Sequence, residues 1–370
     1  MTDIPPSARL YLRPTAFVSA PFDRDGQLLR LAGGMLWFSA LDVIAVADGR
    51  RVADRLVPVD RLDDFIANLT SEQAETAGAT IARLTAPRPP LRLGERIVRL
   101  DQPQVMAILN MTPDSFSDGG KHIDDAEAAA SAGVAMAAAG AAIIDVGGES
   151  TRPRAELVWE GDEIARTVPV IERLARAGTA VSIDTRKAAV MEAALAAGAG
   201  LVNDVSALLW DAKSAEVVAK AGCPVVLMHH QGDPQTMQDD PRYDDALVEV
   251  YDWLEDRVAA AESAGIARDR IILDPGIGFG KTVRHNLAIL NGLAMLHGLG
   301  CPILLGASRK RIIGALADEA PVERRLGGSV ALALAGAAAG VQLLRVHDVF
   351  ETVQALKVWR GMRDEALSPV

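Results

Sequence analysis

Eight short apolar runs follow one another between residues 104 and 347, and the segments between them are long enough to be helices. Runs this short and this rich in Val, Ile and Leu are typical of buried strands, whereas the Ala-rich segments between them favour crossover helices. The runs cover residues 104–110, 141–147, 179–185, 199–205, 223–229, 270–276, 301–307 and 340–347. The pattern therefore predicts a parallel sheet of eight strands.

Two folds contain such a sheet, the closed (β/α)₈ TIM barrel and the open doubly wound sheet, and the ends of the runs favour the barrel. Expected helices include residues 125–140, 187–197, 243–265, 287–299, 324–339 and 349–363. Nearly every run ends in a polar residue, as in a barrel that builds its site at one rim. These residues are Asn110, Asp145, Asp184, Asn203, His229, Asp274, Ser308 and His347.

Residues 1–89 do not follow this rhythm. Alternating and apolar stretches followed by an amphipathic region at 59–84 predict a small α/β module, and the sequence APRPP at 86–90 is typical of a linker. Residues 1–100 carry 13 Arg and 12 Asp or Glu, a charge of +1, which leaves −12 for the remainder. We therefore divide the chain into an N-terminal extension, 1–89, and a catalytic barrel, 90–370. The extension holds no catalytic constellation and is interpreted as a packing or oligomerisation element.

The composition excludes several broad classes of protein. A formal net charge of −11 leaves no extended basic surface for nucleic acid. No apolar run reaches the roughly 18 residues of a membrane span, and the N-terminus lacks the apolar core of a signal peptide. Two cysteines, Cys223 and Cys301, cannot make a disulfide framework, which favours a reducing compartment. We expect a cytoplasmic protein without nucleic-acid or membrane partners.

The loops after the first two runs are rich in hydrogen-bonding groups. Residues 110–120 and 147–153 combine paired glycines with hydroxyls and carboxylates, and the second loop adds the guanidinium of Arg152. Backbone amides, hydroxyls and arginine are the groups that bind phosphate. These loops predict a phosphate site on the rim.

Four strand ends carry a different chemistry. Carboxylates and an amide, from Asp145, Asp184, Asn203 and Asp274, suit the N–H groups and ring nitrogens of a flat heterocycle. Positive charge returns to the same rim with Lys310, Arg345 and His347. Residues two apart on a strand face the same side, so we expect Arg345 and His347 to point together.

Seven motifs in order resemble those of the dihydropteroate synthase family. They are ILNMTPDSFSDGG (108–120), IIDVGGESTRP (143–153), SIDTRK (182–187), LVNDVS (201–206), ILDPGIGFGK (272–281), GASRKR (306–311) and RLGGSVALALAGAAAGVQLLRVHDV (325–349). The resemblance covers roughly residues 91–366. It implies a transferase of folate biosynthesis that joins 6-hydroxymethyl-7,8-dihydropterin diphosphate to p-aminobenzoate, giving 7,8-dihydropteroate and pyrophosphate.

The resemblance also implies a role for individual residues, with catalysis assigned to Lys310, Arg345, His347 and Asp184. The pterin would contact Asp145, Asp184, Asn203, Met228, Asp274, Phe279 and Lys310. The diphosphate would contact Asn110, Thr151, Arg152, Arg345 and His347. The p-aminobenzoate site would contain Thr151, Pro153, Phe279 and Ser308. Asn110 would ligate Mg²⁺, a hard cation that keeps few protein ligands.

We expect a dissociative reaction in which diphosphate leaves before the arylamine attacks, because cationic groups converge where negative charge develops. The loops after the first two strands would then order around the diphosphate. The resemblance further implies a homodimer that packs through barrel helices. We see no insertion near the p-aminobenzoate site of the kind found in sulfonamide-resistant members, so sulfonamide sensitivity is expected.

Some positions depart from the family pattern, and two other functions stay open. Arg154 stands where Gly is common, Met111 replaces a commoner Val, and His230 follows His229 where Met is frequent. Paired metal ligation by His229 and His230 is not expected, because adjacent strand residues face opposite sides. The alternatives are a corrinoid-linked pterin methyltransferase, which shares the barrel and the pterin residues, and a non-catalytic pterin-binding paralogue.

Overall fold

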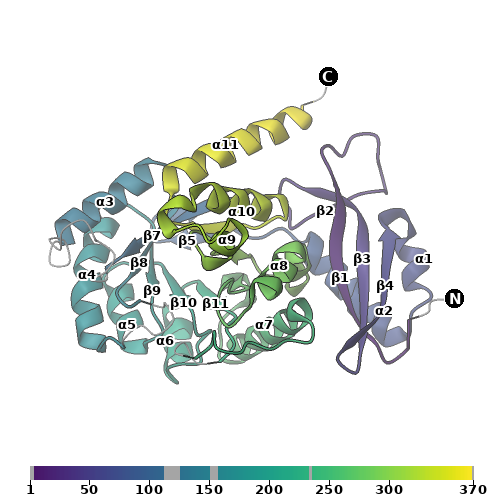
Figure 1. Cartoon of the computed structure of the whole chain (residues 1–370), viewed down its shortest axis with the longest axis horizontal. Helices are drawn as coiled ribbons and strands as arrows, with labels where there is room; N and C mark the ends of the chain where they lie inside the picture. Colours follow the sequence, from purple (N-terminus) through teal and green to yellow (C-terminus); the bar gives the residue numbers. More distant parts are fainter. Residues whose placement is uncertain (1–3, 112–125, 151–156, 233–235, 369–370) are drawn as a thin grey trace.

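The computed structural model describes residues 4–111, 126–150, 157–232 and 236–368. Figure 1 shows two parts side by side, a large one of alternating strands and helices and a smaller one built on an antiparallel sheet. Each part has a hydrophobic core, although Tyr11 and Ile44 of the smaller part pack into the core of the larger one. An N-terminal module preceding a barrel is therefore confirmed.

The large part is a (β/α)₈ barrel. Its strands are β7 (Gln104–Asn110), β8 (Ile143–Gly147), β9 (Val181–Asp184), β10 (Leu201–Asp204), β11 (Val225–Met228), β12 (Ile271–Asp274), β13 (Leu304–Leu305) and β14 (Leu343–Val346). Neighbours pair in the order β12-β11-β10-β9-β8-β7-β14-β13. A parallel bridge between Leu273 and Ile303 joins the two ends of this order. The sheet is thus closed, which confirms the barrel over the open sheet.

Helices follow the strands around the outside of the barrel. They are α3 (Ala126–Ala138), α4 (Glu160–Arg176), α5 (Ala188–Ala196), α6 (Ser214–Ala221), α7 (Ala246–Ser263), α8 (Val283–Asn291), α9 (Arg311–Leu316), α10 (Leu326–Ala338) and α11 (Val349–Ala366), with the 3₁₀ helices η3 (Arg268–Arg270), η4 (Leu293–Leu299) and η5 (Val322–Arg324). Within the described ranges, no helix has the length and apolar character needed to cross a membrane.

One expected helix differs from its prediction. Residues 287–299 do not form a single helix, because α8 begins earlier, at a capping box between Thr282 and His285, and ends before Gly292. A Cβ atom at Gly292 would lie 2.1 Å from a methyl carbon of Leu247, so the chain passes close to α7 there. Beyond this point the backbone tightens into η4.

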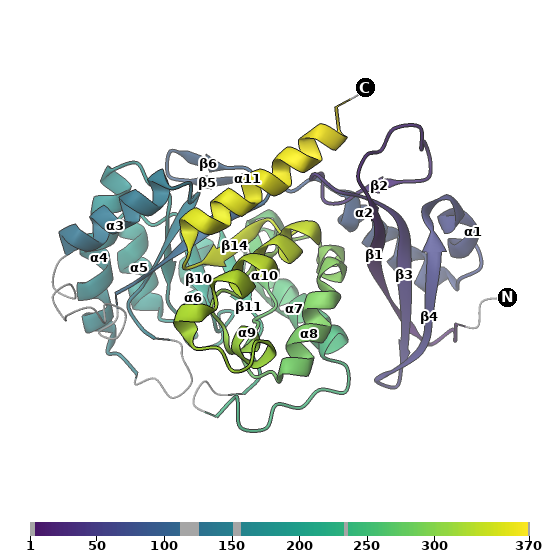
Figure 2. The ribbon, with the colours of Figure 1, turned by 45° about the horizontal axis from the view of Figure 1, so that its top comes forward.

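A short hairpin closes one end of the barrel (Figure 2). It consists of β5 (Leu91–Leu93) and β6 (Arg96–Val98), and its apolar side chains share a core with residues from the starts of the strands, including Ile143 and Leu201. Gly200 marks the closest approach, since a Cβ there would lie 2.9 Å from the Cα of Leu93. The opposite end, where the strands finish, is the end at which barrels carry their sites.

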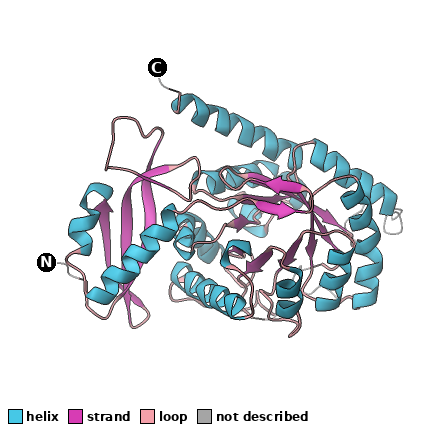
Figure 3. Cartoon of the chain, turned by 180° about the vertical axis from the view of Figure 1, so that it is seen from behind, coloured by secondary structure: helices cyan, strands magenta, loops and turns pink. Residues whose placement is uncertain are grey.

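The N-terminal module is a four-stranded antiparallel sheet with helices beside it (Figure 3). Its elements are β1 (Arg9–Val18), β2 (Leu29–Arg30), β3 (Trp37–Ala47), β4 (Arg50–Pro58), η1 (Val59–Arg61), α1 (Leu62–Ile66) and α2 (Ser71–Thr85). Strand β3 pairs with the other three strands. The role of this module and its boundary at residue 89 stay predictions.

The module packs against η4 and α7 of the barrel. The Tyr11 hydroxyl donates to Asp252 on α7 at 2.8 Å, and Arg51 pairs with Asp245, the N-cap of that helix, at 2.5 Å. Arg83 of α2 donates to the Gly298 carbonyl at 2.6 Å. Every residue of η4 is buried. The barrel therefore contributes a fully buried and mostly apolar helix to this interface, with His297 as its polar residue.

Candidate functional site

The carboxyl ends of β8, β9, β10 and β14 bring four predicted residues into one hydrogen-bonded cluster. Arg345 spans two carboxylates, with Nε 2.6 Å from Asp145 Oδ2 and Nη2 2.5 Å from Asp184 Oδ2. Asn203 Nδ2 donates to the same oxygen of Asp145 at 2.9 Å. Both carboxylates are buried, so the guanidinium supplies the positive charge that makes their burial tolerable.

Two oxygens of this cluster are without a partner among the described residues. They are Oδ1 of Asp145 and Oδ1 of Asp184, both buried. Buried acceptors are ordinarily hydrogen-bonded, so each calls for an N–H donor from a bound molecule. Burial raises the pKa of Asp184, and the Asp145 carboxylate adds to this, whereas Arg345 opposes it. Acceptors held in this way suit the N–H groups of a heterocycle.

Asp274 and Lys310 form the other side of the same mouth. Asp274 Oδ1 accepts from the Gly276 amide at 2.7 Å, and burial raises the pKa of this carboxyl. Lys310 donates to the Ile277 carbonyl, and its Nζ lies 4.5 Å from the centre of the Phe279 ring. Burial lowers the pKa of Lys310 to about 8, against the opposing effect of Asp274.

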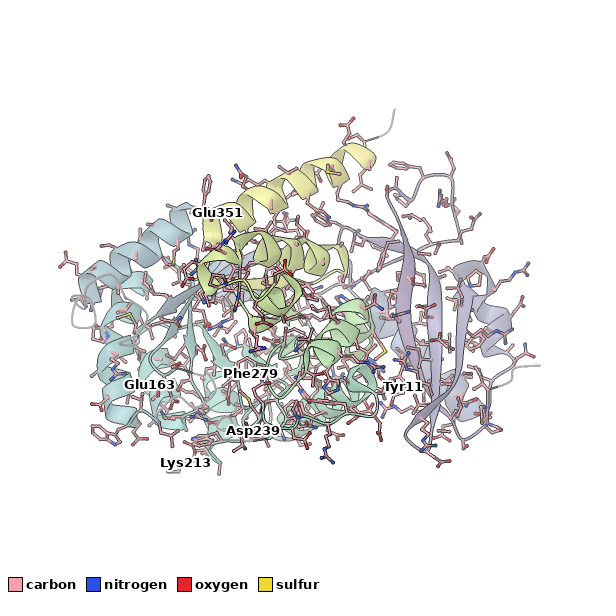
Figure 4. The ribbon with its side chains drawn as sticks, viewed as in Figure 1. Tyr11, Glu163, Lys213, Asp239, Phe279 and Glu351 are labelled. Carbon is pink, nitrogen blue, oxygen red and sulfur yellow. The ribbon has the colours of Figure 1, made fainter. Side chains whose placement is uncertain are left out.

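The remaining described site residues lie around this cluster. Met228, at the end of β11, is buried, while Phe279 is half-buried on the loop after β12. Figure 4 shows Phe279 within the barrel, between Glu163 on α4 and Tyr11 on the N-terminal module. Asn110, half-buried, ends β7 beside Gly147 of β8.

His347 and Arg345 contact different groups. His347 follows β14, and its Nδ1 lies 3.1 Å from the Ser308 hydroxyl, which also accepts from the His347 amide at 3.2 Å. Arg345 instead holds the carboxylates of β8 and β9. The structure thus joins Ser308 and His347 directly, a contact that spacing along the chain did not indicate.

Some predicted residues lie outside the described part of the chain. Thr151, Arg152 and Pro153 are among them, as are Arg154 and the first loop beyond Met111. Their assignments therefore stay predictions.

A buried charge network centred on Glu149 was not predicted from the sequence. Glu149 pairs with Arg186 at 3.2 Å and with Lys187 at 3.1 Å, and Lys187 reaches Glu163 of α4 at 2.6 Å. Glu149 also accepts from the Val158 amide at 3.2 Å. Burial alone would raise the pKa of Glu149, but the Arg186 and Lys187 cations hold it below its usual value. The signal was present in the motifs at 143–153 and 182–187, which contain Glu149, Arg186 and Lys187.

Lys187→Met is expected to lower the free energy of unfolding by about 3–5 kcal/mol at pH 7, because Glu163 is then buried without its cation. The loss should shrink as pH falls below about 5, because the Lys187 cation helps to lower the pKa of Glu149 and this contribution to stability disappears once that carboxyl is protonated. Urea unfolding measures both effects. Lys357→Met, at an exposed position of α11, is the matched control and should change stability by about 0.5 kcal/mol or less. Equal midpoints for the two variants would contradict the expectation.

The ring nitrogens of the two adjacent histidines have different hydrogen-bonding partners, although both rings pack against Trp253. His229 Nδ1 lies 2.7 Å from Lys281 Nζ, while His230 Nδ1 lies 3.1 Å from the Gly232 carbonyl. Among the residues that the structure describes, no group of three or more His, Cys, Asp or Glu side chains is arranged to hold a metal ion.

A family model described as "Pterin binding enzyme" matches residues 106–347, which run from within β7 to just beyond β14 and include every described site residue. The chain belongs to the dihydropteroate synthase family of pterin-binding enzymes. The dihydropteroate synthase of Escherichia coli strain K12 is 47% identical over 260 residues, which cover 70% of this chain and 91% of that protein. The match places the N-terminal module outside the family's common barrel.

Solved structures of dihydropteroate synthases agree with this assignment. The Xanthomonas albilineans enzyme, solved with 4-aminobenzoic acid, is 49% identical with a TM-score of 0.70 and covers 75% of this chain and 98% of its own. The Yersinia pestis enzyme, solved with a sulfonamide drug complex, is 44% identical with a TM-score of 0.71 and covers 74% and 99%. The barrel of this dihydropteroate synthase family member therefore aligns with nearly the whole length of both solved chains.

Proposed function

We propose that this chain joins 6-hydroxymethyl-7,8-dihydropterin diphosphate to p-aminobenzoate, as a transferase of folate biosynthesis. The observation that carries the proposal is the buried cluster of Asp145, Asp184 and Asn203 under Arg345, which places acceptors for a heterocycle beside a cation for a phosphate. Membership of the dihydropteroate synthase family supports the same reaction. Pyrophosphate release that depends on p-aminobenzoate is the deciding assay.

The same assay separates the alternatives. A corrinoid-linked methyltransferase or a non-catalytic paralogue would release no pyrophosphate. The similarity to dihydropteroate synthases over nine-tenths of the relative's length favours the synthase over both. Complementation of a strain lacking this enzyme provides an independent check.

The pterin is proposed to lie between the free oxygens of Asp145 and Asp184 on one side and Asp274 and Lys310 on the other. The two partnerless oxygens would accept from ring N–H and amino groups, and Asn203 offers both a donor and an acceptor. Phe279 and Met228 would pack against the ring, since flat heterocycles are bound largely by apolar contact. The protein would thus recognise the pterin by hydrogen bonds, and the loss of any one of them would leave a buried polar group unpaired.

Arg345 has the capacity to bind diphosphate without releasing the carboxylates. A guanidinium has five N–H donors, of which the described contacts to Asp145 and Asp184 use two. The rest of the group is available, because the Arg345 side chain is 20% exposed. His347 and Ser308 stand on the same rim. Thr151 and Arg152 would complete the diphosphate site, and Pro153 would line the p-aminobenzoate site.

The residues present fit a magnesium ion with few protein ligands. The Asn110 side chain offers a carboxamide oxygen, a hard ligand, at the rim beside β8. We propose Asn110 as the residue that holds Mg²⁺, with diphosphate and water supplying the other ligands. When bound, the ion would neutralise charge on the diphosphate.

The reaction is proposed to be dissociative. The bond between the pterin methylene carbon and the diphosphate oxygen breaks first, and diphosphate leaves with the electron pair. The amine nitrogen of p-aminobenzoate then bonds to the methylene carbon and releases a proton to water. Arg345 and His347 would assist departure, because positive charge is placed where negative charge develops. We expect positional isotope exchange in the diphosphate of the pterin substrate when p-aminobenzoate is absent. Exchange that occurs only when p-aminobenzoate is present would contradict departure of diphosphate before attack.

The pH profile should report on Lys310. This group donates as a cation, and its pKa of about 8 means that the cation is present below that pH and lost above it. We expect kcat/KM to fall as pH rises through about 8. In Lys310→Arg the falling limb should move to higher pH, because arginine stays protonated throughout this range. A limb that stays in place would assign it to another group.

Sulfonamides are expected to inhibit the reaction by competing with p-aminobenzoate. The proposed site for that substrate includes Phe279 and Ser308, and the Yersinia pestis relative was solved with a sulfonamide drug complex. An inhibition curve with sulfamethoxazole measures this, and KM for p-aminobenzoate should rise with the drug while kcat is unchanged. Full activity at high drug would refute it.

We further propose a cytoplasmic homodimer. Exposed apolar side chains lie at the start of α10, at Leu326, and recur along the neighbouring α11, at Phe350, Val358 and Met362. Large exposed apolar side chains that recur along neighbouring helices mark interfaces. Sedimentation should show a dimer, and the Phe350→Glu variant should dissociate more readily.

The proposed cytoplasmic location is a reducing compartment. It is supported by the two cysteines, which are both buried and free of disulfides.

A further inference from the structure

The loop that follows β12 is held through its carbonyl groups. From Gly276 to Gly280, five consecutive carbonyl oxygens each accept a hydrogen bond from a side chain. Lys281 donates to those of Gly276 and Phe279, Lys310 to that of Ile277, Gln238 to that of Gly278 and Tyr243 to that of Gly280. A loop bound in this way takes its shape from the donors around it, and Lys281 supplies two of the five.

Lys281 is buried and lies at the centre of this arrangement. Its Nζ is 2.9 Å from the Gly276 carbonyl, 3.0 Å from that of Phe279 and 2.7 Å from His229 Nδ1. These three contacts match the three hydrogen-bonding positions of the nitrogen, because His229 Nδ1 accepts from an ammonium or donates to an amine, and a longer contact of 3.4 Å reaches the His229 carbonyl. Lys281 is 3% exposed, so its side chain is shielded from bulk solvent.

The backbone of the loop permits this inward folding. Gly276 and Gly280 have φ angles of +65° and +62°, in the left-handed region. Cβ atoms there would lie 1.8 Å from the His229 carbonyl oxygen and 2.4 Å from that of Gln231. The loop therefore lies directly on the backbone that follows β11, and the Lys281 nitrogen joins the two segments.

Two pocket features depend on the resulting shape. The Ile277 carbonyl accepts a hydrogen bond from Lys310 Nζ, and the centre of the Phe279 ring lies 4.5 Å from the same nitrogen. The Ile277 carbonyl and the Phe279 ring both belong to the loop whose Gly276 and Phe279 carbonyls accept hydrogen bonds from Lys281. A change in the loop would thus displace Lys310 from its place beside Asp274.

We propose that Lys281 is a positioning residue for the pterin pocket. Its nitrogen holds residues 276–280 through their carbonyl groups and thereby fixes the positions of Lys310 and Phe279. The inference rests on the proposed pterin pocket. It assigns Lys281 no contact with substrate, and its effect reaches the reaction through the loop.

Chemical rescue tests the proposal. Lys281→Ala leaves a space lined by two carbonyl oxygens and His229, whereas Lys281→Met fills that space without a donor. Binding of 6-carboxypterin, which carries no diphosphate, would be measured by calorimetry. Both variants are expected to lose affinity by about tenfold or more, since buried acceptors are left unpaired. Propylammonium should restore affinity to Lys281→Ala and not to Lys281→Met, and propanol should restore neither.

Two further variants make the result decisive. Lys281→Gln, which keeps two N–H donors, is the milder change should the alanine variant fail to fold, and its affinity should lie between those of wild type and Lys281→Met. Lys357→Met is the exposed control and should bind as wild type does. The proposal is overturned if Lys281→Met or Lys281→Gln binds 6-carboxypterin as tightly as wild type, or if folded Lys281→Ala shows no amine rescue.

Failure of the pocket assignment has its own readout. Asp274→Asn changes a group proposed to face the pterin but keeps the side-chain oxygen that accepts from the Gly276 amide, so the loop that Lys281 holds retains this contact. Unchanged binding in Asp274→Asn would overturn the pocket itself. Weakened binding there, with Lys281→Met unaffected, would overturn the role of Lys281 alone.

Discussion

Arg345→Met is expected to abolish most of the activity and to destabilise the fold as well. The substitution removes the cation that lies 2.6 Å from Asp145 and 2.5 Å from Asp184. Loss of one group that stabilises the departing charge should lower kcat/KM by about 10²–10³-fold. Two carboxylates left buried without a cation should lower the free energy of unfolding by about 3–5 kcal/mol.

The pH dependence separates this electrostatic effect from general damage to the fold. Without Arg345, the pKa of at least one carboxyl rises in the folded state, so protonation at lower pH stabilises the variant. The stability deficit in urea should therefore be smaller at pH 5 than at pH 7. Arg176→Met, which breaks an exposed pair with Glu172 on α4, is the control and should cost about 0.5 kcal/mol or less. A deficit that does not vary with pH would contradict the explanation.

Removal of residues 1–89 is expected to leave an unstable barrel, although family members have barrels without this module. The module covers η4, whose Leu293, Met295, Leu296 and Leu299 are all at most 1% exposed. Each such side chain contributes about 1.5–3 kcal/mol through burial. Exposing even part of η4 should lower Tm on the order of 10 °C. Differential scanning calorimetry and soluble yield measure the effect.

The comparison needs a control that keeps the module in place. A protease site introduced at 86–90 and then cut leaves both parts present, held by contacts such as Tyr11 to Asp252 and Arg83 to the Gly298 carbonyl. The cut protein should melt close to wild type, and only the truncated protein should lose stability. A truncated chain with unchanged Tm and kcat would show that the module is a dispensable appendage. Complementation with both forms extends the test to cells.

The barrel could be predicted from the sequence because the alternation of apolar runs and helical segments is local and repeated. Each buried strand needs an apolar run, and each crossover needs a helix, so the eightfold alternation survives errors in any one segment. The prediction failed at 287–299, where the break at Gly292 depends on a close contact with Leu247 from a different helix. Such a contact leaves no periodic trace in the chain.

The site was accessible in part, for a related reason. Parallel strands end on the same rim, so polar residues at their carboxyl ends were expected to meet, and Asp145, Asp184 and Asn203 do so. The hydrogen-bonding partner of each group could not be predicted from the sequence. Nothing in the spacing indicated that Arg345 would span two carboxylates, or that Glu149 and Lys187 would bury their charges together.

The sequence by itself determined the barrel, the rim on which the chemistry lies and the family to which the motifs belong, because these follow from residue types at regular intervals. The tertiary structure decided how charges pair, how Lys281 holds the loop at 276–280 and how η4 is covered by the N-terminal module. Hydrogen bonds and close packing depend on distances of a few ångströms between segments far apart in the chain. Those distances exist only once the chain has folded.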